Sequence, residues 1–147
     1  MDFEYINGRI TRGRGIASGR GFDPNNSRIT DSIRKQKPYF EGIVPEISKV
    51  FNGTINIDIS PREFEILRPD YEVSCEWEKE IYEKFWFVRT ILHHDNSLHV
   101  GLLYYPCPGY LKKHKNTIIE FLADWIVGIK IDDSVTIRYS PEQFRII

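Results

Sequence analysis

The chain has 147 residues, of which 41% are hydrophobic and 28% charged. This composition is typical of one globular domain, so we expect a single domain over residues 1–147. The net charge of −1 argues against a nucleic-acid-binding protein, and no apolar stretch is long enough to cross a bilayer. We therefore expect a cytoplasmic protein without a nucleic-acid or membrane partner, and its oligomeric state stays open.

The first elements are two short extended pieces around a turn, followed by a glycine-rich loop. Residues 3–6 and 9–11 flank the turn dipeptide Asn7-Gly8. Residues 13–21 then hold four glycines and two arginines, whose backbone N–H and guanidinium groups can bind phosphate. A solvated surface loop is the alternative. The candidate phosphate-binding residues are Gly13, Arg14, Gly15, Ile16, Ala17, Ser18, Gly19 and Arg20.

Helix is expected mainly before residue 50. One short helix should occupy residues 30–37, because Pro38 disfavours its continuation. A weaker helical piece should occupy residues 40–49. Residues 1–40 contain eight basic and four acidic side chains, which suits a local anionic ligand.

A turn at Asn52-Gly53 leads into the most regular strand pattern of the chain. Alternation directs Ile55, Ile57 and Ile59 into a core and the intervening polar side chains to the other face.

That polar face is a candidate magnesium site. Thr54 and Asn56 offer the oxygen ligands that Mg²⁺ accepts beside substrate phosphates, and Asp58 on the same face is a candidate catalytic base. The alternative interpretation is that Asn52-Gly53 forms an ordinary tight turn and that the polar face is the solvated side of a half-exposed strand.

The rest of the chain is predicted to consist mainly of strands. Residues 71–77 alternate, residues 85–92 and 98–105 form a hairpin around Asp95-Asn96, and further strands are expected at 118–122 and 135–139. Residues 125–127 are expected to form a turn of helix. A basic run, Lys112–Lys115, can hold phosphate or an acidic substrate edge, or is simply solvated. Many short strands with one or two short helices predict a mainly β fold, a small six-stranded closed barrel.

Four features in order resemble the archaeal CTP-dependent riboflavin kinases, which are cradle-loop β-barrels. These are the strand before the Gly13-Arg14-Gly15 loop, the motif Gly53-Thr54-Ile55-Asn56, the strand Thr117-Ile118-Ile119-Glu120 after His114, and the turn Asp132-Asp133 before the final strand. The resemblance extends over nearly the whole chain, and Gly-Thr-Ile-Asn is its specific part.

The resemblance implies transfer of the terminal phosphoryl group of CTP to the 5′-hydroxyl of riboflavin, which gives FMN. It implies that Thr54 and Asn56 hold Mg²⁺ and that the glycine-rich loop holds the nucleotide phosphates. It also implies a flavin site at Lys112, His114, Thr117 and Glu120. Thr117 and Lys112 stand where the family has a carboxylate and a threonine.

Two other functions stay open. A barrel that has lost the flavin contacts would be a non-catalytic nucleotide or small-molecule sensor, which the absence of a carboxylate at Thr117 favours. A cradle-loop interaction or DNA-binding module would share only the fold, because a fold does not fix a function.

Overall fold

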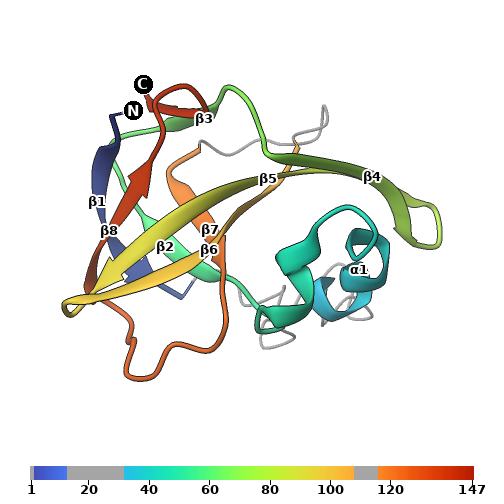
Figure 1. Cartoon of the computed structure of the whole chain (residues 1–147), viewed down its shortest axis with the longest axis horizontal. Helices are drawn as coiled ribbons and strands as arrows, with labels where there is room; N and C mark the ends of the chain where they lie inside the picture. The colour runs from blue at the N-terminus through green and yellow to red at the C-terminus, as the bar shows by residue number, and fades with distance from the viewer. Residues whose placement is uncertain (1, 13–31, 108–115) are drawn as a thin grey trace.

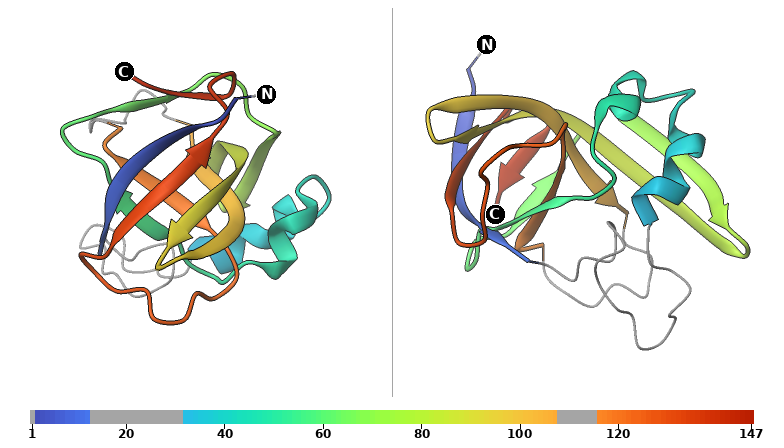
Figure 2. Two further views of the ribbon diagram at one scale, coloured as in Figure 1. Left: turned by 60° about the vertical axis from the view of Figure 1, so that its left-hand side comes forward. Right: turned by 90° about the horizontal axis from the view of Figure 1, so that it is seen from below.

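The computed structural model describes residues 2–12, 32–107 and 116–147, and it shows a mainly β protein. Its seven-stranded sheet has the order β4-β5-β6-β7-β2-β1-β8, and β8 also pairs with β5. Six of these strands therefore close into a ring (Figures 1 and 2). The seven strands are β1 (Glu4–Thr11), β2 (Ile55–Asp58), β4 (Tyr71–Glu78), β5 (Ile81–His94), β6 (Ser97–Pro106), β7 (Ile118–Leu122) and β8 (Ser134–Tyr139).

The long strand β5 explains how one sheet forms both a ring and an extension. Its second half pairs with β8 through Leu92 and Ile137, which closes the ring. Its first half pairs with β4 and extends beyond the ring (Figure 1). We call β4 together with residues 81–87 of β5 the arm. The hairpin turn at the other end of β5 lies at Asp95 and Asn96, as predicted. Both residues have positive φ, as a two-residue turn of type I′ requires.

Strand alternation produces two hydrophobic cores. Inside the ring, side chains such as Ile6, Ile57 and Phe121 are almost completely buried. Outside it, the helix α1 (Ser32–Phe40) and the 3₁₀ helix η2 (Pro45–Lys49) pack on the arm and on neighbouring strands. The ring of Phe40 lies edge-on to Phe85 and Phe87 at centroid distances of 5.0 Å. The predicted short helices therefore cover one outer face of the sheet.

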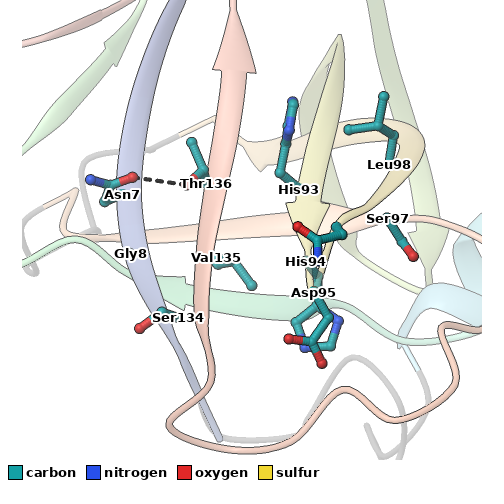
Figure 3. A pocket seen from close by; sticks show the side chains of 11 residues that line it. Asn7, Gly8, His93, His94, Asp95, Ser97, Leu98, Ser134, Val135 and Thr136 are labelled. Atoms are coloured by element: carbon teal, nitrogen blue, oxygen red, sulfur yellow. Dashed lines mark hydrogen bonds between the residues drawn. The ribbon is translucent and has the colours of Figure 1, made fainter.

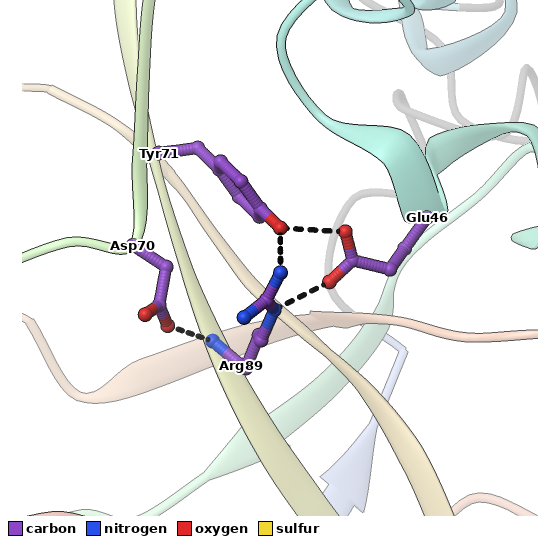
Figure 4. Close-up of polar contacts among 4 residues, drawn as sticks. All are labelled: Glu46, Asp70, Tyr71 and Arg89. Atoms are coloured by element: carbon purple, nitrogen blue, oxygen red, sulfur yellow. Dashed lines mark hydrogen bonds and ion pairs between the residues drawn. The ribbon is translucent and has the colours of Figure 1, made fainter.

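A polar cluster joins η2 to the arm (Figure 4). Arg89 Nε donates to Glu46 Oε2 at 2.8 Å, and the Tyr71 hydroxyl donates to Glu46 Oε1 at 2.8 Å. Arg89 also contacts the Tyr71 hydroxyl, and its own N–H donates to Asp70 Oδ2 at 2.7 Å. Burial favours the neutral carboxyl of Glu46, but the hydrogen bonds from Arg89 and Tyr71 outweigh it and lower the Glu46 pKa. The cluster fixes η2, which leads the chain into β2.

Three local predictions were wrong. Asn7-Gly8 lies inside β1, where glycine is needed because a Cβ would stand 2.5 Å from Ile57 Cγ2. The helix α1 includes Pro38 and continues to Phe40, whose burial holds the last turn. Residues 125–127 are not helical: Ile126 is 5% exposed and packs into the core of the ring, whereas Trp125 and Val127 are 58% and 85% exposed. The sequence analysis also missed the small pair of strands β3 (Phe64–Ile66) and β9 (Phe144–Ile146).

A buried hydrogen bond in the outer core gives a stability prediction. The Tyr104 hydroxyl donates to Gln36 Oε1 at 2.6 Å, and the two residues are 5% and 2% exposed. Tyr104→Phe removes the donor and leaves a buried amide oxygen unpaired, so we expect a loss of about 1 to 3 kcal/mol in the free energy of unfolding. Urea denaturation measures this. Adding Gln36→Met should recover part of the loss, and full additivity of the two substitutions would contradict the pairing.

Candidate functional site

The candidate site is a pocket of about 530 Å³ at the end of the ring where β2 begins. Its lining includes Thr54 and Asn56, the two predicted magnesium ligands. It also presents two cationic side chains, Arg12 and Lys130, and one acidic side chain, Asp124. The pocket therefore brings the predicted metal ligands together with positive charge, although its cations come from two distant parts of the sequence.

A second cavity, of about 620 Å³, contains none of the predicted site residues (Figure 3). It lies where β1, β5, β6 and β8 meet, and its polar groups are already paired in part. Thr136 Oγ1 donates to Asn7 Oδ1 at 2.8 Å. His94, which lines this cavity, is 7% exposed. We therefore consider the smaller pocket the better candidate site.

Thr54 and Asn56 have the geometry of neighbouring ligands of one small cation. Thr54 Oγ1 lies 3.0 Å from Asn56 Oδ1, to which it donates a hydrogen bond. Two adjacent oxygens of an octahedral Mg²⁺ site, each at 2.0–2.1 Å, stand roughly 3 Å apart. Rotation of the Thr54 hydroxyl would move its proton away from Asn56 Oδ1 and leave a lone pair on each oxygen for a shared ion. The two side chains thus fit the predicted metal, with phosphate oxygens and water completing the shell.

The backbone around Asn56 fixes this geometry. Asn56 Nδ2 donates to the Arg12 carbonyl oxygen at 3.3 Å, so the amide oxygen is left to face Thr54. Just before β2, the Gly53 N–H donates to the Phe51 carbonyl at 2.9 Å, a bond of the γ-turn type. The expected polar face is real, but Asn56 is only 9% exposed, so it is more enclosed than the open face of a half-exposed strand.

Cross-strand register brings Glu120 to the same row. Asn56 is opposite Thr11 on β1 and Glu120 on β7. Directly opposed residues point to the same face with Cβ atoms roughly 5 Å apart. Glu120 is also close enough to Tyr104 to help raise the pKa of that phenol, after burial as the larger cause. The predicted flavin contact Glu120 therefore lies beside the predicted metal ligand Asn56, in a half-buried position.

The other predicted site residues have different outcomes. Asp58 Oδ1 accepts the Ser60 N–H at 2.8 Å, and Asp58 is not part of the pocket lining among the described residues. Thr117 is half-buried immediately before β7, and its carbonyl accepts the Ile59 N–H at 2.9 Å. Residues 13–20, Lys112 and His114 lie outside the described residues. In the structure, Asn56 therefore lies next to Thr54 and opposite Glu120, whereas the Asp58 carboxylate is bound in a turn.

Most of the pocket lining was missed by the sequence analysis, including two cationic and two aromatic residues. Arg12 immediately precedes the glycine-rich segment, which was a usable signal. Lys130 carried no motif. Phe51 and Trp125 form an edge-to-face pair with centroids 4.9 Å apart, although they are 38% and 58% exposed. An exposed aromatic pair at a pocket offers apolar ring surface to a planar ligand, because ring pairs are attracted in stacked or edge-on arrangements.

A hydrogen bond between the buried His94 and the half-exposed Asp133 predicts a pH effect. His94 Nε2 donates to Asp133 Oδ2 at 2.8 Å, and this bond, with the Lys130 N–H, lowers the pKa of Asp133. A carboxyl group whose pKa is lowered by folding stabilises the folded state when the pH is above its pKa in the unfolded chain, about 3.9. This stabilisation is lost as the pH falls through the pKa of the folded state. Asp133→Asn should thus destabilise the protein at pH 7 and matter much less near pH 2. Urea denaturation at both pH values tests this, and an equal loss at both would contradict it.

No known protein family model matches the sequence, and no curated protein matches it significantly. None of the helices among the described residues is both long enough and apolar enough to cross a bilayer. The interpretation of the site therefore depends on its own geometry.

Proposed function

We propose that the protein is a magnesium-dependent phosphotransferase of the CTP-dependent riboflavin kinase type, acting in the cytoplasm. The observation that carries this proposal is the 3.0 Å contact between Thr54 Oγ1 and Asn56 Oδ1 inside a pocket that also presents Arg12 and Lys130. Neutral oxygen ligands next to cationic side chains suit a metal-bound triphosphate, because the ion is shared with phosphate oxygens and the cations neutralise the remaining charge.

The reaction requires positioning more than covalent chemistry from the protein. The 5′-hydroxyl oxygen of riboflavin forms a bond to the γ-phosphorus of CTP or another nucleoside triphosphate. The bond from that phosphorus to the β,γ-bridging oxygen breaks, the nucleoside diphosphate leaves, and the hydroxyl proton is released. Arg12 and Lys130 would stabilise the charge on the transferred and leaving phosphates, which lowers the barrier electrostatically.

The remaining residues of the pocket would orient the substrates. Thr54 and Asn56 would hold Mg²⁺, which supplies charge neutralisation when bound. Phe51 and Trp125 would provide ring surface for a base or a flavin. Glu120, which is opposite Asn56 although it does not line the pocket, would contact the acceptor together with the predicted residues Lys112, His114 and Thr117, while residues 13–20 would cradle the phosphates. We assign no role in proton transfer to Asp58, because its carboxylate accepts the Ser60 N–H in a turn.

The finer fold assignment belongs to the same proposal. We infer a closed cradle-loop barrel from the pairing of β8 with β5, which leaves the six-stranded ring without an edge. The glycine-rich residues 13–21 follow β1 directly, in the order that this fold requires.

The proposal is tested by incubating the protein with riboflavin, Mg²⁺ and each of the four ribonucleoside triphosphates, with FMN measured by chromatography and fluorescence. We expect FMN with CTP and none after chelation of the metal. No FMN with any of the four nucleotides would refute the kinase assignment.

The second candidate is a non-catalytic nucleotide-binding barrel. Thr117, in place of the family's carboxylate, favours it, because a neutral side chain holds a polar flavin edge less strongly. Thermal-shift titration would then show stabilisation by CTP and Mg²⁺ while no FMN forms. If neither stabilisation nor turnover is seen, both functions are excluded.

A further inference from the structure

Among the described residues, the arm has one strand with an open edge. β4 is the last strand of the sheet order, and within the described residues it pairs only with β5. The Cys107 N–H donates to the Lys84 carbonyl at 2.8 Å, so the backbone of Lys84 faces β6 and that of Phe85 faces β4. Phe85 is opposite Val73. Alternation therefore directs the N–H and C=O groups of Glu72, Ser74 and Glu76 to the open edge.

This edge is acidic. Between Asp70 and Lys84 the chain has six acidic and two basic residues. Glu72 and Glu76 lie on the same face of β4 on either side of Ser74. The carboxylate of Glu72 accepts the Trp86 Nε1–H at 2.7 Å, which holds it close to the strand.

Charge decides which kind of strand can pair here. A strand added to the edge would place its side chains roughly 5 Å from those of Glu72 and Glu76, where opposite charges attract and like charges repel. Pairing of β4 with β4 of a second copy would oppose acidic residues to acidic residues. An extended segment with basic residues four positions apart would instead match both glutamates.

We propose that the open edge of β4 binds an extended, Lys- or Arg-bearing segment of a partner protein by β-strand addition. The main-chain groups of Glu72, Ser74 and Glu76 supply the hydrogen bonds, and the two glutamates select the basic segment. This inference goes beyond the proposed kinase activity and is independent of the nucleotide pocket.

The probe is a fluorescent seven-residue peptide that alternates lysine and valine, compared by anisotropy with the same peptide carrying glutamate for lysine. We expect the lysine peptide to bind with an affinity that falls with salt, and the glutamate peptide not to bind. Ser74→Pro should weaken binding about tenfold or more without changing the thermal midpoint, because the Ser74 N–H takes no part in the β4–β5 ladder.

Two neutralised variants separate the edge from overall charge. Glu72→Gln with Glu76→Gln should weaken binding, whereas Glu63→Gln with Glu142→Gln removes the same charge elsewhere and should leave binding unchanged. Equal effects of the two pairs, or wild-type binding by folded Ser74→Pro, would overturn the proposal. If Ser74→Pro does not fold, hydrogen exchange of the wild-type protein tests the proposal instead. The lysine peptide should slow amide exchange at Glu72, Ser74 and Glu76, and unchanged exchange rates at these residues would overturn the proposal.

Discussion

Replacing Thr54 by Val and Asn56 by Leu together should lower Mg²⁺-dependent FMN formation at least about 100-fold, since even outer contacts of metal sites are worth 10- to 100-fold. The substitutions remove the two oxygens that lie 3.0 Å apart in the pocket. They also leave the Arg12 carbonyl without the Asn56 amide, which should cost about 1 kcal/mol of stability. Steady-state rates at several Mg²⁺ concentrations measure the effect.

Thr136→Val is the matched control, because it deletes a threonine hydroxyl from another ring strand, outside the candidate pocket. It should leave turnover unchanged. Thermal denaturation must show that the double variant is folded. A folded double variant with wild-type turnover would show that the two side chains do not hold the ion.

Gly101→Ala should be among the most destabilising single substitutions in the ring. A Cβ at Gly101 would stand 2.3 Å from the Leu122 carbonyl oxygen and 2.4 Å from Phe121 Cζ. Because the first contact is with backbone, relief requires β6 and β7 to separate. We expect a loss of about 3 kcal/mol or more in the free energy of unfolding, at the upper end for overpacked sites. Chemical denaturation measures it.

Gly42→Ala is the control for the loss of glycine flexibility. No atom lies within 4 Å of the Cβ position at Gly42, so the change should stay within about 0.5 kcal/mol or stabilise slightly. If both alanine variants have wild-type stability, the close packing of β6 on β7 at Gly101 is wrong.

Much of the fold could be predicted because it depends on local signals. Alternation identified β4 and β8, and apolar runs identified β7 and the β5–β6 hairpin, whose turn residues Asp95 and Asn96 adopt the positive φ values that such a turn needs. The errors arose where tertiary contacts decide. Gly8 was taken as a turn signal, whereas its lack of a side chain admits Ile57. The pair β3 and β9 joins two three-residue strands far apart in sequence, which no local pattern reveals.

The candidate site was predictable only in the part that lies on one strand. Thr54 and Asn56 are two residues apart, so strand geometry alone placed them together. The nearness of Glu120 to Asn56 depends on the register between β2 and β7, and the contribution of Lys130 depends on the path of the chain after β7. Trp125 was interpreted as part of a helical turn. The sequence alone does not distinguish an exposed aromatic side chain at a pocket, such as Trp125, from a buried one.

Closure of the ring has a consequence for biosynthesis. Thr136 on β8 donates a hydrogen bond to Asn7 on β1, and these residues are 129 positions apart in the sequence. The β8 side of β1 therefore stays unpaired until β8 has been synthesised. Folds dominated by such distant pairings form in milliseconds to seconds, slower than helical bundles. During that interval the unpaired strands are exposed to aggregation, so chaperone binding to nascent chains should favour the yield of native protein.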